Sequence, residues 1–508
     1  MDPKPEATEK SSTQTASSPD VSKEESYNNV LPPLDVVFEE YLYCAAIQRR
    51  AEDSPSGTDN QEKTSWVAKF SKDVNIDVTV RDANDLSVIE DSEKVNAFRA
   101  LRTASWASVF YLITTDILGP FNAPYAISQV GWVPGIILYF IMGVAALYCG
   151  LILWRLFIRL DSPKYPLKTY ADIAERLLGR SARHVGTICL SNGQALSQMS
   201  KNRLCFSVCI VIWAFAGMII GQIRTLKNYG WLANGAVWFN LLIIFISMGV
   251  VAHSPPNFES ANRALGVPQG PVATHAFEPH TLFDKVNGIM NMVFAYGGAM
   301  IFPEMMAEMR RPMDFWKGMV MAQALIFSAY LLYGAFVYAF QGQFTLPLAF
   351  QGLSIFAWQT VCNALALVSG LIAAGLYGNI GITFIIGSAI PQVQTISALI
   401  ASVAIMQFSY TFPFLLRVAY DVATDAMVAD KAYVPGQGTS GRIDTWRQWS
   451  RWRRGIFSGR WYFKLFNFGA GLACLAMACL GMWGSGKTIQ QTFLHANAAT
   501  SFGCNPPV

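Results

Sequence analysis

Long apolar runs separated by polar loops dominate the chain after residue 100. A helix needs about 20 predominantly apolar residues to cross a bilayer core, and several runs reach that length. The sequence therefore predicts an all-α polytopic membrane protein with about 10 to 11 spans. The clearest spans are residues 103–129, 132–158, 204–223, 231–252, 286–309, 318–340 and 465–483.

Two further regions are shorter than ordinary spans. Residues 185–200 hold only about 16 residues, against the usual 17–25. Residues 356–416 have room for two comfortable spans or three minimal ones. The basic loops 161–183 and 417–464 are both expected on the cytoplasmic side. That placement needs residues 185–200 to cross the membrane, and it needs either three short helices within residues 356–416 or a perturbed topology.

The first apolar run carries helix-breaking and charged residues at its centre. Asp116, Gly119, Pro120 and Pro124 lie within the stretch TTDILGPFNAP. Each proline lacks a backbone N–H, so the helix cannot close its hydrogen bonds there. Open backbone at membrane depth persists only where it is buried in protein or lines a cavity. We therefore expect a discontinuous first helix that contributes to a binding site.

The sixth apolar run contains a second candidate break. Residues 294–299 read FAYGGA, and Pro303 follows. Glycine in a helix interior costs about 1 kcal/mol relative to alanine. Interruptions in spans 1 and 6, at corresponding positions of two halves, indicate a 5+5 inverted repeat with the substrate site between the halves.

Composition and charge agree with a membrane protein. Hydrophobic residues make up 52% of the chain and charged residues 14%, whereas soluble domains carry about 25% charged residues. The net charge of +4 gives no sign of nucleic acid binding. The five histidines lie in loops or at span ends without a metal-binding spacing, so neither an enzyme nor a cofactor is expected. We expect a disordered cytoplasmic tail over residues 1–100 with one short helix near residues 36–47, a transmembrane domain over 101–490 and a short tail over 491–508.

The candidate site follows from the two breaks. An acid at the bilayer centre is functional by default, so Asp116 is expected either to take part in proton coupling or to hold the substrate amine; the alternative is that it caps freed N–H groups. N–H groups around the first break would meet the substrate carboxylate, and open carbonyls of both breaks would meet its amine. Asn192 and Gln194 face either the cavity or a neighbouring helix. The predicted substrate contacts are Thr115, Asp116, Ile117, Leu118, Gly119, Asn192, Phe294, Ala295, Tyr296 and Gly297, and the predicted coupling or gating residues are Asp116, Glu304 and Glu308.

Several stretches resemble the amino acid/auxin permease family, and in particular the fungal neutral amino acid permeases of the methyltryptophan-resistance type. The resemblance covers roughly residues 100–490. The matching stretches are 116–132 (DILGPFNAPYAISQVGW), 169–179 (TYADIAERLLG), 191–200 (SNGQALSQMS), 231–239, 252–258 (AHSPPNF), 294–315 (FAYGGAMIFPEMMAEMRRPMDF) and 407–414 (QFSYTFPF).

The resemblance implies the amino-acid–polyamine–cation (LeuT-like) fold with discontinuous helices 1 and 6. It implies a secondary transporter of neutral amino acids, driven by a proton or sodium gradient, with protons usual among fungal relatives. It favours the plasma membrane over the vacuolar membrane. The chain departs from the family pattern in two places, because spans 3 and 9 are truncated relative to it, before Ser191 and between Phe384 and Val393. This departure leaves a second reading open, in which the protein is an amino acid sensor or a degenerate permease that does not transport. The substrate within the amino acids and the oligomeric state stay open.

Overall fold

A computed structural model of the chain describes residues 36–53, 102–178, 226–375, 393–435 and 439–494. Within these ranges the regular structure is helical, and the extended pairing consists of one parallel bridge between Ala104 and Met309. Five of the described helical segments are long and apolar enough to cross a bilayer, namely Trp132–Leu160, Leu232–His253, Pro312–Phe344, Ser397–Ala426 and Trp461–Gln491. The prediction of an all-α polytopic membrane protein is confirmed.

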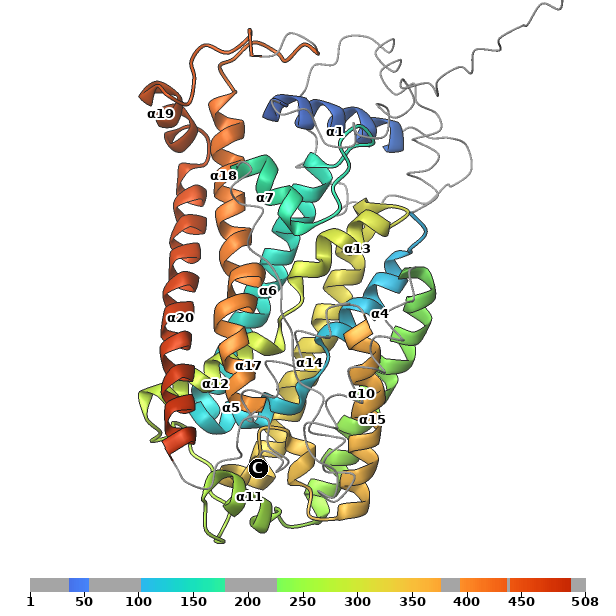
Figure 1. The fold of residues 1–508 in the computed structure, drawn as a ribbon, viewed down its shortest axis with the longest axis vertical. Helices are drawn as coiled ribbons and strands as arrows, with labels where there is room; N and C mark the ends of the chain where they lie inside the picture. The colour runs from blue at the N-terminus through green and yellow to red at the C-terminus, as the bar shows by residue number, and fades with distance from the viewer. Residues whose placement is uncertain (1–35, 54–101, 179–225, 376–392, 436–438, 495–508) are drawn as a thin grey trace, which may run out of the picture.

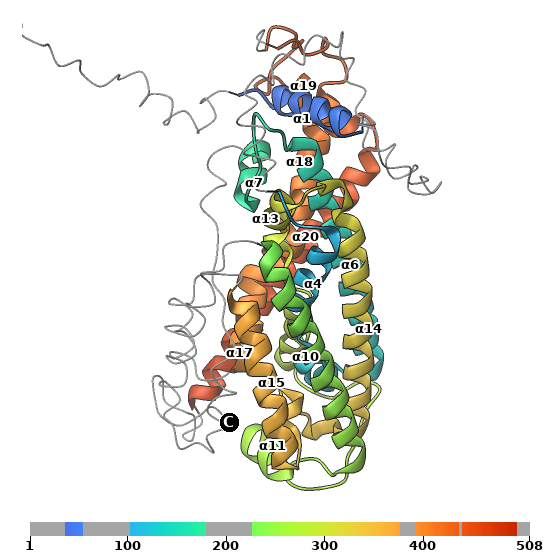
Figure 2. The ribbon, with the colours of Figure 1, turned by 90° about the vertical axis from the view of Figure 1, so that its right-hand side faces the viewer.

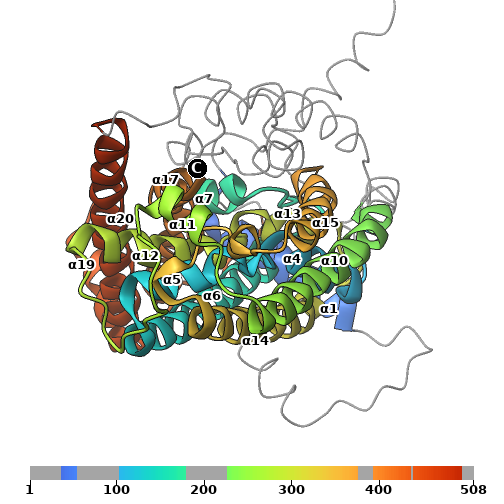
Figure 3. The same ribbon diagram turned by 90° about the horizontal axis from the view of Figure 1, so that it is seen from below.

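The bundle is built from long helices and from two helices that are interrupted near their middles (Figure 1). Helix α14 packs against α4, α5 and α6, while α10 packs against α4 and α15. Helix α20 lies at one side of the bundle, and α10 and α15 lie at the other (Figure 3). The elements are α4 (Trp106–Ile117), η2 (Pro120–Asn122), α5 (Ala123–Val130), α6 (Trp132–Leu160), α7 (Tyr170–Leu178), α10 (Leu226–His253), α11 (Phe258–Leu265), α12 (Leu282–Ala295), η4 (Ala299–Ile301), α13 (Phe302–Glu308), α14 (Phe315–Gln341), α15 (Phe356–Gly375), α17 (Val393–Ile400), the π-helical segments η8 (Ala401–Ile405) and η9 (Gln407–Thr411), α18 (Phe412–Ala426), α19 (Trp449–Phe457) and α20 (Trp461–Leu494).

The charge distribution orients the bundle in the membrane. Helices α7 and α19 share one end of the molecule with α1 (Phe38–Asp53), and α11 lies at the other end (Figures 1 and 2). Among the described residues, the lysines and arginines at the α11 end are Arg263, Lys285 and Lys487, and all the others lie toward the α1 end. Positive residues mark the cytoplasmic side, so we infer that the end with α1, α7 and α19 faces the cytoplasm and refer to it below as the cytoplasmic end.

The described spans agree with the predicted ones at most boundaries. The first run forms α4 and α5, and the sixth run forms α12 and α13. Helix α18 continues to Ala426, past the predicted start of the basic loop at Arg417, and within this extension Arg417 pairs with Asp421 one turn later at 2.9 Å. Helix α20 is longer than the predicted last span and ends at Leu494.

Several predictions fall outside the described residues. These are the short third span over 185–200 with Asn192 and Gln194, the fourth span over 204–223, and the shortened ninth span, whose region includes residues 376–392. Helix α15 and the run from α17 to α18 lie on either side of this last gap.

Helix α1, which the apolar stretch near residues 36–47 predicted, is docked on the cytoplasmic end. Glu39 accepts two hydrogen bonds from Arg442, at 2.8 and 2.6 Å. Glu40 accepts from Lys164 and from the Tyr165 hydroxyl, each at 2.7 Å. Burial raises the pKa of Glu40, but these hydrogen bonds outweigh burial and leave that pKa below its ordinary value. Helix α1 therefore bridges the loop that follows α6 and the loop that follows α18.

Candidate site at the two helix breaks

The first break lies between α4 and η2. Helix α4 ends at Ile117, and Pro120 and Pro124 prevent the chain from continuing the same helix because neither has an N–H to donate. The Leu118 N–H donates back to the Thr114 carbonyl at 2.7 Å, and Gly119 donates to the Ile117 carbonyl at 2.8 Å. The chain then turns through η2 and resumes as α5, which carries Pro124 in its first turn.

Side chains from two other spans satisfy the carbonyls freed by this break. The Tyr330 hydroxyl, from α14, donates to the Ile117 carbonyl at 2.5 Å and accepts from the Gly119 N–H at 3.2 Å. Asn240, from α10, donates to the Leu118 carbonyl at 2.6 Å. Both side chains are almost fully buried. An unpaired buried carbonyl is costly, so these two residues stabilise the interruption.

The second break lies between α12 and α13. Helix α12 ends at Ala295, and the N–H groups of Tyr296 and Gly297 donate to Val293 and Phe294 at 3.3 and 3.0 Å. The short η4 turn follows, and α13 starts with Pro303 in its first turn. The Gly297–Gly298 pair therefore interrupts the sixth span where the sequence predicted.

The two breaks are in direct contact. A Cβ atom on Gly298 would lie 2.8 Å from the Asp116 carboxylate and 2.8 Å from the Ile117 side chain. A Cβ atom on Gly297 would lie 2.7 Å from Ile405, in the π-helical segment η8. A side chain at either position would force these neighbouring side chains to shift, so glycine allows the backbone of the sixth span to approach them closely.

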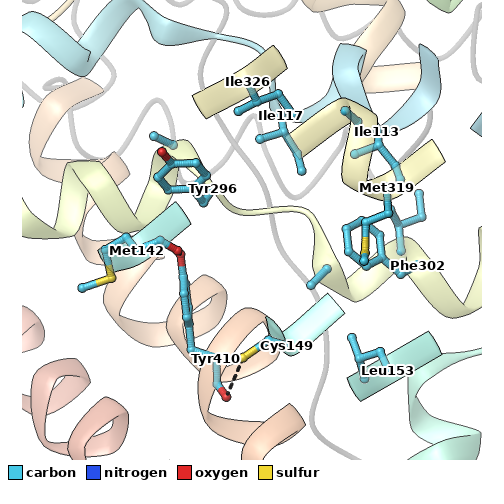
Figure 4. Packing of buried hydrophobic residues seen from close by; sticks show 14 of the residues in the cluster. Ile113, Ile117, Met142, Cys149, Leu153, Tyr296, Phe302, Met319, Ile326 and Tyr410 are labelled. Carbon is cyan, nitrogen blue, oxygen red and sulfur yellow. Dashed lines mark hydrogen bonds between the residues drawn. The ribbon is translucent and has the colours of Figure 1, made fainter. Parts of the chain in front are cut away.

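Three tyrosines surround this contact. The ring centroids of Tyr139, Tyr296 and Tyr330 lie 5.5 to 6.2 Å apart. The Tyr296 hydroxyl donates to the Tyr139 carbonyl at 3.3 Å. The Tyr139 hydroxyl is fully buried and makes no hydrogen bond with any residue that the structure describes. Figure 4 shows Tyr296 and Ile117 within the same buried cluster as Met142 and Tyr410.

The structure brings most of the predicted substrate residues together at this contact. Asp116 to Gly119 form one side, and Phe294 to Gly297 form the other. Thr115 is turned toward α10, where its hydroxyl donates to the Ala233 carbonyl at 2.7 Å. Asn192 lies outside the described residues.

The predicted gating acids occupy the cytoplasmic end of the sixth span. Glu304 is exposed, and within the described part of the chain no ion pair joins it to a cation. The Glu308 carbonyl accepts from the Ala104 N–H at 3.0 Å, and the Arg310 N–H donates to the Ala104 carbonyl at 2.9 Å. The start of the first span and the end of the sixth span are therefore joined through their backbones.

A buried ion pair lies beside this backbone bridge. Arg102 donates to Asp161 at 2.8 Å, and Asp161 also accepts from Arg49 at 3.2 Å and from the Leu167 N–H at 3.1 Å. The Asp161 side chain is completely buried. These contacts hold the residues that precede the first span, and the end of α1, against the C-terminal end of α6.

Sequence reasoning missed Tyr330 and Asn240. Each is a polar side chain within a long apolar helix, Tyr330 in α14 and Asn240 in α10. In a membrane span such a side chain tends to face a polar partner in the bundle, but α14 also holds Tyr333 and Tyr338 and α10 also holds Asn234, so the sequence did not single out Tyr330 or Asn240. The identity of the partner was not readable from the sequence.

Removing the Tyr330 hydroxyl is expected to destabilise the protein. The Tyr330→Phe variant removes one of the two donors to the Ile117 carbonyl, whose other donor is the Gly119 N–H, and the loss of a buried hydrogen bond costs about 0.5–1.5 kcal/mol. The matched control is Tyr139→Phe in the same aromatic cluster, which removes a hydroxyl that makes no hydrogen bond with the described residues. Thermal unfolding of the purified variants should show a clear loss for Tyr330→Phe and none for Tyr139→Phe. Equal losses of thermal stability in the two variants would contradict a stabilising role for the Tyr330 hydroxyl.

The fold and the site together define the class of protein. Two helices interrupted near their middles, in contact inside a polytopic helical bundle, are typical of secondary transporters. The sequence model of the family described as "Transmembrane amino acid transporter protein" matches residues 102–378. This is more than half of the 508 residues, and the chain belongs to this family.

A relative in Neurospora crassa carries the name N amino acid transport system protein. It is 24% identical over 253 residues, which are 46% of this chain and 51% of that protein. The chain therefore matches about half the length of this curated relative. The resemblance found in the sequence motifs is confirmed at the level of the family.

Proposed function

We propose that this protein is a secondary active transporter that imports neutral amino acids, coupled to protons, by alternating access at the plasma membrane. The substrate would bind where the two breaks meet. Its carboxylate would face the N-terminal end of the η2–α5 segment, where the helix dipole is positive, and its amine would face the side of Asp116. Phe294 and Tyr296 would flank its side chain.

One observation supports this proposal most strongly. Gly298 of the sixth span lies against Asp116 and Ile117 of the first span, so closely that a side chain at Gly298 would force these neighbours to shift. A substrate bound at this contact would touch both halves of the repeat at once. Any movement of one half against the other would then change the environment of the substrate, as alternating access requires.

Uptake by the full-length chain tests the proposal. Labelled neutral and aromatic amino acids would be offered to permease-deficient cells that express the protein, with and without a protonophore. Uptake that the protonophore abolishes supports a proton-driven importer. Binding of the amino acid without uptake, by protein present in the membrane, would instead support the sensor reading.

The Asp116→Asn variant tests whether Asp116 couples amino acid uptake to protons. The substitution keeps the size of the side chain and removes its charge, so we expect uptake to fall at least tenfold and the remaining uptake to lose its dependence on external pH. The Asp314→Asn variant, on an acid at the cytoplasmic surface that pairs with Lys317, is the control and should keep normal uptake. Unchanged, pH-dependent uptake by Asp116→Asn would remove Asp116 from the coupling mechanism.

A further inference from the structure

Helix α19 (Trp449–Phe457) has two faces of unusual character. It lies at the cytoplasmic end beside α18 and α20 (Figure 1). Arg451 and Gly455 are buried on its inner face. The helical period places Trp449 and Arg453 on the opposite face and Trp452 between the two faces, and the two tryptophans are 69% and 43% exposed. The buried face thus carries a cation, and large aromatic rings are exposed outside it.

The arginines of the inner face are neutralised within the protein. Arg451 lies 2.9 Å from Asp430 and 3.4 Å from Asp444. Arg454 lies 2.7 Å from Asp444. Hydrogen bonds from Arg454 and Ser450 hold the pKa of Asp444 below its ordinary value. These contacts hold α19 in place. They also pair Arg451 and Arg454 with carboxylates of the protein, so neither arginine is available to bind an external anion.

Three other arginines near α19 are exposed and can contact an external anion. Arg447, Arg453 and Arg460 are exposed, and none of them forms an ion pair within the part of the chain that the structure describes. Large aromatic side chains are exposed around them. These are Trp449, Trp452, Phe457, Trp461 and Tyr462.

The exposed arginines and aromatic side chains around α19 lie at the level of the lipid headgroups. The apolar part of α20 begins at Leu465, directly after Lys464, so the first turn of α20, residues 461–464, reaches into the cytoplasmic interface. Tryptophan and tyrosine are enriched at that level, and the cytoplasmic leaflet carries anionic lipids. We propose that the exposed face of α19 and the start of α20, centred on Arg447, Arg453 and Arg460, is a binding surface for anionic lipid headgroups of the cytoplasmic leaflet.

The surface is rigidly attached to α18. A Cβ atom on Gly455 would lie 2.8 Å from the Val422 carbonyl, so α19 is pressed against α18. Arg454 donates to the Ala426 carbonyl at 2.8 Å, and Lys464 pairs with Asp425 at 2.6 Å. Because α18 continues from η8, which contacts Gly297 at the second break, bound lipid would stabilise the helix that supports the substrate site.

The test compares two variants of the full-length protein. One carries Arg447→Gln, Arg453→Gln and Arg460→Gln. The matched control removes the same charge from exposed residues outside the α19 surface, by Lys168→Gln, Arg311→Gln and Lys431→Gln. Each protein is reconstituted in nanodiscs of phosphatidylcholine alone or of roughly four parts phosphatidylcholine to one part phosphatidylserine. The thermal unfolding temperature and the phosphatidylserine retained after detergent extraction are measured.

We expect phosphatidylserine to raise the unfolding temperature of the unmodified protein and of the control. The triple variant at the α19 surface should lose this rise and retain at least fivefold less phosphatidylserine, while unfolding normally in phosphatidylcholine. High salt should weaken the effect in the unmodified protein, because exposed charges are screened. An equal rise in all three proteins overturns the proposal. So does a rise produced by glycerophosphoserine, the soluble headgroup, in phosphatidylcholine alone, because the surface would then bind a free anion. These readouts do not depend on amino acid transport.

Discussion

Replacing Gly298 by alanine is expected to reduce amino acid uptake at least roughly tenfold, with the protein still present in the membrane. The added methyl group would lie 2.8 Å from both the Asp116 carboxylate and the Ile117 side chain. Overpacking of this kind costs about 1–3 kcal/mol, and about 1.4 kcal/mol corresponds to a tenfold change. Because the strain falls on the contact between the two interrupted spans, it should affect transport more than folding.

The control for this variant is Gly249→Ala in α10. A Cβ atom at Gly249 meets nothing within 4 Å, so this variant should transport normally. Uptake kinetics and surface biotinylation would be measured side by side for both variants. Normal uptake by Gly298→Ala would show that the two breaks separate easily, and would argue against a substrate site that needs them in contact.

Replacing Asp161 by asparagine is expected to cause the largest loss of stability. Asp161 is completely buried and faces both Arg102 and Arg49. Removal of one partner from a buried ion pair costs about 3–5 kcal/mol, because the remaining charge stays buried. The unfolding temperature of the purified protein should fall by roughly 5 °C or more, and less protein should reach the membrane.

The stability of Asp161→Asn has a matched control in Asp314→Asn. Asp314 forms a partly exposed pair with Lys317 at 2.6 Å, and such pairs contribute about 1 kcal/mol or less. The double variant Arg102→Gln with Asp161→Asn should recover part of the lost stability, since one of the two cations that faced Asp161 is gone. A similar small loss for both single variants would indicate that water reaches Asp161.

The interruptions of the first and sixth spans were predictable from the sequence because their causes are local. Pro120 and Pro124 lack the N–H that a helix needs, and Gly297–Gly298 weakens the sixth helix at its centre. The symmetry of the two positions also predicted that they meet. Such features depend on residue type and spacing alone.

The stabilising partners of the breaks were not predictable in the same way. Tyr330 lies 213 residues from the Ile117 carbonyl that it binds, and Asn240 lies 122 residues from Leu118. Which carbonyl each side chain reaches depends on how three helices pack. The ion pair between Arg102 and Asp161 and the π-helical turns at 401–411 likewise arise from tertiary packing.

The position of α1 has a practical consequence for experiments on shortened chains. Deleting the first 53 residues would take from Lys164 and Arg442 the two glutamates that they bind. A fluorescent protein inserted within residues 38–53 would do the same. Differences in abundance between a full-length and a shortened chain would then reflect the loss of a docked helix, as well as the loss of any sorting signal in the tail.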